Sequence, residues 1–284
     1  MEENRASSTA LSVAKVRAFH QLMDDDPKIL ADPVILRLLG QTTVDEIRAN
    51  AEWRMNERFA AFRGHIILRN RYAEDCLQAA VERGGRQYVL LGAGYDTFAY
   101  RQPTWAKELT IFEVDHPASQ AAKRKLLAAA EIALPGNLRF AAVNFEFDPL
   151  QQGLQAARFD FTRPAFFSCL GVLVYLDETA IAALFEFVGS MARGSELVFT
   201  FSQPDSALDE REMESRAKIN SKVNEMGEPW RSYFEPEQLR EMLLGAGFSD
   251  VDFLTPGAAA ERYFVGRTDL LRPPRHVRLC RAVV

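Results

Sequence analysis

Two glycines and a carboxylate follow neighbouring apolar segments of the chain. The segment "QYVLL" leads into Gly92-Ala93-Gly94, and the next apolar segment ends at Asp115, 23 residues after Gly92. Glycine lets a backbone turn tightly and approach a ligand with no Cβ in the way. A carboxylate at the end of the second strand suits the two hydroxyls of a ribose. The spacing predicts a nucleoside site, although a glycine pair after a strand can also be a tight connection only.

A further acid lies just beyond the second glycine. The run "GAGYDT" from Gly92 contains Asp96 and no third glycine. A dinucleotide cradle uses G-x-G-x-x-G to seat a pyrophosphate on a helix N-terminus. Asp96 would repel a pyrophosphate but could attract a cationic ligand with an amino group, such as S-adenosylmethionine. The charges therefore favour a methyl donor over NAD, and an NAD-dependent oxidoreductase is the alternative.

These residues require strands that end together. Between Gln87 and Ser202, five short apolar runs ("QYVLLG", "LTIFEVD", "LRFAAVNF", "PAFFSCLG", "SELVFTFS") alternate with helical patterns. Strands that are apolar on both faces and separated by helices are typical of a parallel sheet covered on both sides, which binds ligands at its carboxyl edge. Two later runs, "SDVDFLT" and "HVRLCRAVV", predict an antiparallel edge hairpin. We expect an α/β, Rossmann-like fold with a seven-stranded, mostly parallel sheet.

Helical patterns flank the strands. Residues 1–86 predict a helical cap within the same domain, its first helix capped by Ser8 or Thr9, with Gly64 as a candidate break and Gly84-Gly85 as the stop. Residues 87–284 form the ligand-binding part. The charged stretch near 206–230 predicts a helical insertion, either a movable lid or a solvated surface helix.

Composition narrows the class of protein. The 284 residues carry a net charge of −5 and 48% hydrophobic residues, which argues weakly against nucleic acid or an anionic membrane as the main partner. Cys76, Cys169 and Cys280 are widely spaced, without CxxC or a Cys/His cluster, so we expect buried free thiols and no metal site. The N-terminus lacks a signal-peptide core, and the longest apolar run falls short of a membrane span. We expect a cytoplasmic protein.

Three ordered motifs resemble the leucine carboxyl methyltransferase family: "LGAGYDTFAYR" from Leu91, "FEVDHP" from Phe112 and "SCLGVLVYL" from Ser168. This family of class I S-adenosylmethionine-dependent methyltransferases includes polyketide carboxyl methyltransferases and bacterial members of unknown substrate. The resemblance extends over nearly the whole chain, through "RNRYAEDCL" and "EPWRSYFEPEQL". It implies S-adenosyl-L-methionine as cofactor and O-methylation of a small-molecule carboxylate.

The resemblance also implies roles at the first two strand ends. Gly92 would lie against the methionine portion of the cofactor, with Ala93, Gly94 and Asp96 in the same loop. Asp115 would hold the ribose.

Further roles fall on side chains around these strand ends. His116 could lie near adenine or ribose, or could be only a helix-start histidine. Asn144 would accept a hydrogen bond from the adenine amino group, and Phe145 would pack on the ring. Arg71, or less favourably Arg69, matches the arginine that pairs with the cofactor carboxylate.

The acceptor side contains Leu170 and Tyr175. Leu170, counted with the cofactor-binding residues, replaces a glutamate of members that act on protein phosphatase C-termini, which argues against that substrate. Tyr175 is the candidate catalytic residue, lining the acceptor pocket, or else a core tyrosine. An ionised carboxylate acceptor needs no general base, only orientation.

Two departures from the family pattern keep a second alternative open. Asn144 stands where the family has aspartate, and Phe98 where many relatives have arginine. A non-catalytic S-adenosylmethionine-binding protein would be compatible with both. The identity of the acceptor and the oligomeric state stay open.

Overall fold

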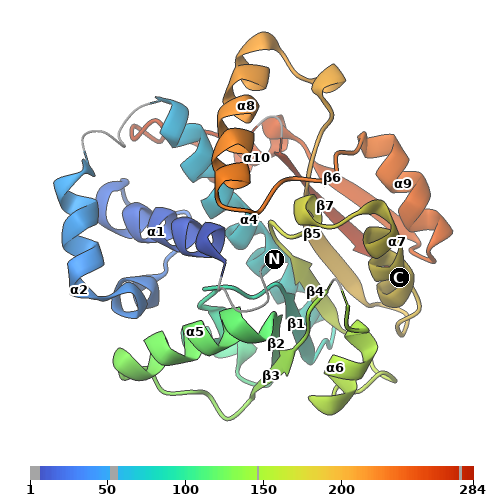
Figure 1. The fold of residues 1–284 in the computed structure, drawn as a ribbon. Coiled ribbons are helices and arrows are strands. Elements are labelled where there is room, and N and C mark those ends of the chain that lie inside the picture. Colours follow the sequence, from blue (N-terminus) through green and yellow to red (C-terminus); the bar gives the residue numbers. More distant parts are fainter. Residues whose placement is uncertain (1–6, 52–56, 146, 275–276) are drawn as a thin grey trace.

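A single seven-stranded sheet organises the chain. The structure is a computed structural model that describes residues 7–51, 57–145, 147–274 and 277–284 (Figure 1). The strand order is β3-β2-β1-β4-β5-β7-β6. Strands β1 to β5 pair in parallel, whereas β7 runs antiparallel to both β5 and β6. The strands are β1 (Gln87–Leu91), β2 (Thr110–Asp115), β3 (Leu138–Ala142), β4 (Phe166–Cys169), β5 (Glu196–Ser202), β6 (Asp250–Leu254) and β7 (Val277–Val283).

The predicted strands are confirmed, and burial explains them. Every residue of β1, β4 and β5 is buried, as expected for strands that helices cover on both faces. β3 lies at one edge of the sheet and exposes Arg139 and Ala142. The predicted edge pair is confirmed as β6 and β7.

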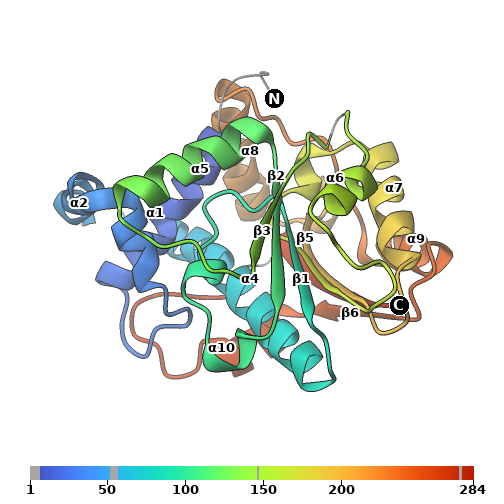
Figure 2. The same cartoon turned by 90° about the horizontal axis from the view of Figure 1, so that it is seen from below.

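Helices form a layer on each face of the sheet (Figure 2). α4 and α5 lie on one side, and α6, α7 and α9 lie on the other. The helices are α1 (Ser8–Met23), α2 (Pro33–Ala49), α4 (Glu57–Glu82), α5 (Pro117–Ala129), α6 (Leu150–Ala156), α7 (Glu178–Gly189), α8 (Glu210–Glu225), α9 (Pro236–Gly245) and α10 (Pro256–Tyr263), with the short 3₁₀ turns η1 (Phe98–Tyr100), η2 (Thr104–Ala106), η3 (Leu173–Tyr175) and η4 (Asp205–Ala207).

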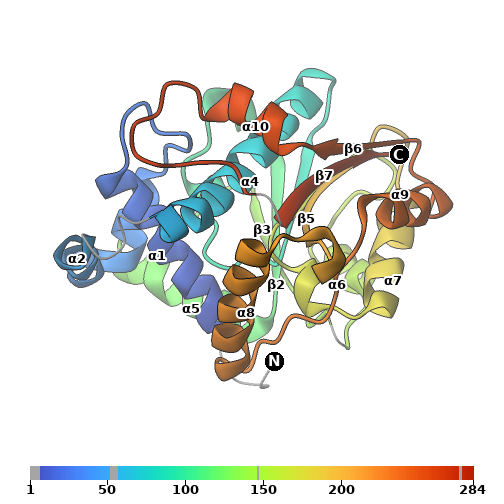
Figure 3. The ribbon, with the colours of Figure 1, turned by 90° about the horizontal axis from the view of Figure 1, so that it is seen from above.

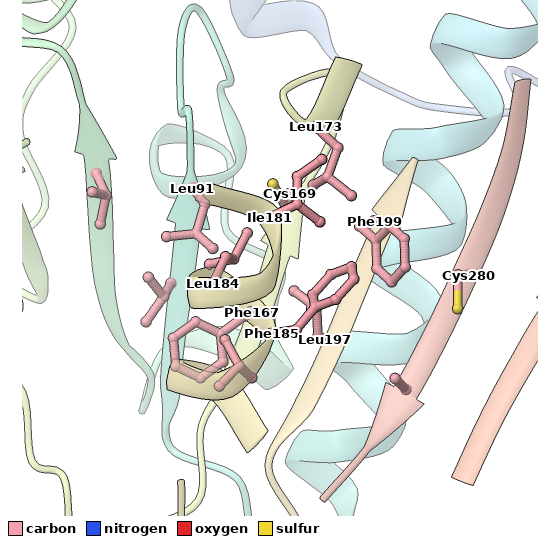
Figure 4. Packing of buried hydrophobic residues seen from close by; sticks show 14 of the residues in the cluster. Leu91, Phe167, Cys169, Leu173, Ile181, Leu184, Phe185, Leu197, Phe199 and Cys280 are labelled. Carbon is pink, nitrogen blue, oxygen red and sulfur yellow. The ribbon is translucent and has the colours of Figure 1, made fainter. Parts of the chain in front are cut away.

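One core lies between the sheet and α7. Ile181, Leu184 and Phe185 of α7 pack onto residues of β4 and β5 such as Phe167 and Phe199 (Figure 4). Burial of each such side chain stabilises the fold by about 1.5–3 kcal/mol. The core fixes the strands whose carboxyl ends form the site. The three cysteines are buried free thiols, as predicted: Cys76, Cys169 and Cys280.

Two helix features, the cap of α1 and the break at Gly64, differ from the predictions. Ser7, rather than Ser8 or Thr9, caps α1 through a bond from the Ala10 N–H. Within α2, Gly40 adopts φ +79° and kinks the helix. α4 continues unbroken through Gly64, because the glycine serves packing: a Cβ there would lie 2.1 Å from the Arg272 carbonyl oxygen.

Gly84 and Gly85 do stop α4, through bonds to the Val81 and Ala80 carbonyls. In the described part of the chain, no helix combines the length and apolarity that a bilayer crossing needs. The same residues contain no group of three or more histidine, cysteine or acidic side chains placed to hold a metal ion.

Candidate active site

A cleft opens where the strand order reverses. β1 and β4 are neighbours in the sheet, but the chain continues from β1 to β2 on one side and from β4 to β5 on the other. Open α/β sheets bind ligands at such a point. The cleft has a volume of about 920 Å³ and is lined by residues that follow β1, β2, β3 and β4. α1, α4 and α8 complete its walls, and α8 lies beside α1 over the strand ends (Figure 3).

The loop after β1 needs both of its glycines. Gly92 has φ +68°, and a Cβ on it would lie 2.3 Å from Cγ2 of Val172. Gly94 has φ +45°, and its N–H donates to Oδ2 of Asp115 at 2.5 Å. The N–H groups of Gly92 and Ala93 both donate to the Val114 carbonyl. The tight turn therefore carries the backbone across the end of β2.

Asp115 is held by the backbone on both carboxylate oxygens. Oδ2 accepts from Gly94 N–H, and Oδ1 accepts from the His116 N–H at 2.7 Å. Burial raises the pKa of this carboxyl, although the two backbone bonds act in the opposite direction. The carboxylate is thus fixed in place at the cleft wall, with lone pairs left for a ligand.

His116 is a helix cap that also lines the cleft. Its Nδ1 accepts from Ala118 N–H at 3.2 Å at the start of α5. Nδ1 as acceptor makes Nε2 the donor when the ring is neutral. The helix-start reading of His116 is correct, and the side chain lies next to Asp115.

Asp96 lines the same cleft and is bound at both oxygens. Oδ1 accepts from Phe98 N–H at 2.7 Å, and Oδ2 accepts from the Asn70 amide at 2.9 Å. Asn70 comes from α4, so this contact joins the glycine loop to the helix before β1.

The two candidate arginines lie in different places. Arg69 lines the cleft, whereas Arg71 is 44% exposed, pairs with Asp75 and lines a separate groove. The geometry therefore reverses the preference for Arg71 over Arg69. The Arg69 guanidinium packs against Gly171, where a Cβ would lie 2.5 Å from Nη1. Burial lowers the pKa of Arg69 to about 10, against the opposing effects of Tyr175 and Asp96.

Asn144 and Phe145 follow β3 at the far side of the cleft. Both are partly buried and line it, and Phe145 packs on the central core. The Asn144 carbonyl accepts from the N–H groups of Phe147 and Asp148, which fixes a turn.

Leu170 and Tyr175 lie on the segment after β4 and line the cleft. Burial raises the pKa of the Tyr175 hydroxyl, while Trp230, Thr9 and Arg69 act to lower it. The structure thus brings together ten of the eleven predicted site residues, all except Arg71.

Sequence reasoning missed the contributions of α1 and of the segment after α8. Thr9 and Trp230 meet at Tyr175 although they lie far apart in the sequence. Trp230 belongs to the "EPWRSYF" run that carried part of the resemblance, which was the one available signal.

The topology and the site together define a class I methyltransferase-like protein: strand order β3-β2-β1-β4-β5-β7-β6, a reversed β7, a glycine loop after β1 and an acid after β2. Solved structures show the same fold. A "putative methyltransferase" from Thermobifida fusca YX superposes with a TM-score of 0.57 at 18% identity over 95% of this chain and 93% of that one. A DUF574 family protein from Streptomyces avermitilis superposes with a TM-score of 0.56 at 15% identity, over 96% of each chain.

Sequence comparison identifies the family. The leucine carboxyl methyltransferase profile matches residues 10–189. A "putative S-adenosyl-L-methionine-dependent methyltransferase", YktD of Bacillus subtilis, is 30% identical over 95% of each chain. A relative of the same description from Mycobacterium tuberculosis is 32% identical over 65% of this chain and 62% of its own length. The chain belongs to the leucine carboxyl methyltransferase family, so the predicted family, fold and S-adenosyl-L-methionine dependence are confirmed at that level.

Proposed function

We propose that this protein transfers a methyl group from S-adenosyl-L-methionine to a carboxylate oxygen of a small molecule. One observation carries the proposal: a helix and two strand ends bring Arg69, the glycine loop and Asp115 to one cleft at the switch point of the sheet. Each has the chemistry to bind one part of the methyl donor.

The residues fit that group part by part. Asp115, fixed by two backbone N–H groups, is suited to accept from ribose hydroxyls. The Arg69 guanidinium has a buried Nε that lacks a hydrogen-bond acceptor among the described residues, and a cofactor carboxylate would supply one. Asp96 adds negative charge for an ammonium group. Asn144 can accept from an adenine amino group, and Phe145 offers an apolar surface to its ring.

The chemistry asks little more of the chain. The acceptor oxygen supplies the electron pair of the new C–O bond, the pair of the broken C–S bond stays on sulfur, and a methyl ester and a neutral thioether result. Because a carboxylate acceptor is already ionised, no proton has to be removed. The protein's part is alignment in a water-poor cleft, which can contribute about 7–11 kcal/mol. Tyr175 is placed to orient the acceptor.

Calorimetric titration tests the cofactor half of the proposal. S-adenosylmethionine and S-adenosylhomocysteine should bind in the micromolar range, and Asp115→Ala should abolish binding. NAD should not bind, because Asp96 lies where a pyrophosphate would need space and positive charge. Tight NAD binding would support the oxidoreductase alternative instead.

Incubation with a labelled methyl donor and a library of carboxylic acids tests the transfer half. Base-labile methyl esters are the expected products. Asn144 replaces the family's aspartate and favours one other reading, a binding protein without catalysis. Cofactor binding without transfer to any acceptor would support that reading.

A further inference from the structure

The cleft extends beyond the strand ends into an apolar space. We name this space the acceptor chamber and define it by six cleft-lining side chains from three helices: Val13 and Val16 of α1, Phe62 and Ile66 of α4, and Ile219 and Val223 of α8. None of the six carries a hydrogen-bonding group. Val16, Ile66 and Val223 are at most 6% exposed, so the chamber walls are part of the folded core.

The apolar walls of the acceptor chamber do not match the polar groups of the cofactor. Its polar parts match the strand-end residues, and the helices α1, α4 and α8 lie over those ends (Figures 1 and 3). An apolar space that continues from the cofactor cleft is therefore left for the acceptor. A polar acceptor body placed against these six side chains would lose hydration that they cannot replace with hydrogen bonds, although the same helices also line the cleft with polar residues such as Ser12, Lys15 and Lys218.

The Trp230 indole nitrogen is a buried polar group that faces this region. It lies within reach of the Tyr175 hydroxyl and acts to lower the pKa of that hydroxyl, but it forms no hydrogen bond of good geometry to a described residue. A buried donor left unsatisfied costs free energy, which a ligand oxygen would recover.

The Trp230 position is fixed by the two residues that follow it. The next residue, Arg231, donates its N–H to the Val174 carbonyl at 2.6 Å. Ser232 Oγ donates to the Leu173 carbonyl at 2.8 Å. The segment after α8 is thereby tied to η3, which carries Tyr175, so the two side chains keep their relation to each other.

We infer that the acceptor is a monocarboxylic acid with an extended apolar body, which occupies the acceptor chamber while its carboxylate accepts a hydrogen bond from the Trp230 indole. This inference rests on the proposed carboxylate methylation and specifies its substrate class. Amino acids, peptides and dicarboxylic acids are poor acceptors, because each would put a second polar group against the chamber walls.

Binding of probe acids tests the chamber without requiring turnover. The full chain, saturated with S-adenosylhomocysteine, is titrated by calorimetry with hexanoate, octanoate and decanoate. Affinity should rise about threefold to fourfold per added methylene, the factor expected for burial of each CH₂ group. Decanedioate should bind far more weakly than decanoate. Affinity that does not depend on chain length, or a preference for the diacid, overturns the inference.

Two variants separate the chamber from the indole. Ile219→Asn should flatten the dependence on chain length, whereas Ser221→Asn on the exposed side of α8 should leave it unchanged. Trp230→Phe leaves an aromatic ring and removes the N–H, so decanoate should bind about tenfold more weakly or worse, whereas 1-decanol, whose oxygen is an uncharged acceptor, should lose less affinity. Equal losses for acid and alcohol, or no loss, contradict the role of the indole.

The two proposals fail in different ways. Every titration first records binding of S-adenosylhomocysteine itself. If the unmodified protein does not bind S-adenosylhomocysteine, the proposed function is contradicted. Normal S-adenosylhomocysteine binding and methyl transfer confined to polar acids would leave the methyltransferase standing and overturn the apolar acceptor.

Discussion

The guanidinium of Arg69 occupies the space that a side chain at Gly171 would fill: a Cβ on Gly171 would lie 2.5 Å from Nη1. Gly171 also has φ +74°, which an L side chain adopts only with strain. Gly171→Ala should therefore push Arg69 away from the cleft and weaken S-adenosylhomocysteine binding at least tenfold in calorimetry.

The strain needs its own control. Gly40 has φ +79°, and a Cβ there would meet nothing within 4 Å. Gly40→Ala, at φ +79° and ψ 162°, and Gly171→Ala should both lower the free energy of unfolding by about 1–3 kcal/mol, the cost of a side chain in a sparsely populated backbone region. Only Gly171→Ala should lose cofactor affinity. Equal losses in both variants would assign the effect to strain rather than to Arg69.

Arg69 and Arg71 provide a matched pair of substitutions. Arg69 lines the cleft, and Arg71 pairs with Asp75 outside it. Arg69→Ala should weaken S-adenosylhomocysteine binding by about 1.5–3 kcal/mol, the usual contribution of a hydrogen bond to a charged group. Arg71→Ala should leave the dissociation constant within about twofold, because exposed ion pairs contribute little. The reverse ranking would restore the sequence-based preference for Arg71.

Arg69 and Arg71 also show what the sequence could not predict, namely which of two nearby helical residues faces the cleft. The motif placed an arginine of "RNR" at the cofactor but could not fix the helical phase. Residues two apart on a helix point about 200° away from each other, so only one of the two can face the cleft. The phase is set by packing of α4 on the sheet and on α1, which no local pattern encodes.

Strands and turns could be predicted from the sequence more easily than the phase of α4. β1 to β5 were predictable because each contains a run of apolar residues between helical patterns. Gly84 and Gly85 act through local backbone geometry. The predicted helix break at Gly64 was wrong because this glycine makes room for the Arg272 carbonyl, which lies far along the chain. Trp230 was overlooked for the same reason, since its meeting with Tyr175 is a long-range contact.

Cofactor affinity should depend on pH through Asp115. Burial raises the pKa of this carboxyl above its ordinary value of 3.8. The ionised form is the one that accepts ribose hydroxyls, so affinity should fall as the pH drops, at a midpoint above 3.8. Ligand binding favours the ionised form and should release protons near that midpoint.

Calorimetry of S-adenosylhomocysteine binding in buffers of different ionisation enthalpy measures this proton release. Asp115→Asn retains the shape and cannot titrate, so its weaker binding should lose the acid limb. An unchanged acid limb in the variant would assign the pH dependence to another group.

A buried network joins the cap to the glycine loop. Arg17 of α1 donates to the Tyr95 carbonyl at 3.0 Å and the Thr97 hydroxyl at 2.6 Å, and its Nε donates to Asp32 at 3.1 Å. Burial acts to raise the pKa of Asp32, but Arg17, Arg101 and Thr97 outweigh it and the pKa is lowered. In the native protein this pairing stabilises the fold above pH 3.8, and the stabilisation is lost as the pH falls through the lowered value.

Arg17→Ala leaves the buried Asp32 with Arg101 as its remaining arginine partner and should cost about 3–5 kcal/mol of unfolding free energy at neutral pH. The deficit should shrink as the pH is lowered, because protonation of Asp32 removes the poorly compensated charge. Denaturant titrations at several pH values measure both effects. Arg37→Ala, an exposed arginine that contacts only backbone carbonyls in the described structure, should change stability by less than about 0.5 kcal/mol. A deficit independent of pH would contradict the role of Asp32.

We propose that α8 and the segment after it act as a lid over the cleft, held by Glu228. Its carboxylate accepts from Ser7 Oγ at 3.0 Å and from Ser8 N–H at 3.1 Å, at the N-terminus of α1. A carboxylate at a helix N-terminus contributes about 0.3–1 kcal/mol of stability, which would favour the closed position of a lid without preventing it from opening.

Glu228→Ala should speed dissociation of S-adenosylhomocysteine severalfold in stopped-flow measurements and increase amide exchange in α8. Glu225→Ala, on exposed Glu225 at the end of α8, removes only a contact with Ser221 and should leave both rates unchanged. If the two variants release the ligand at the same rate, α8 is a surface helix and the lid is excluded.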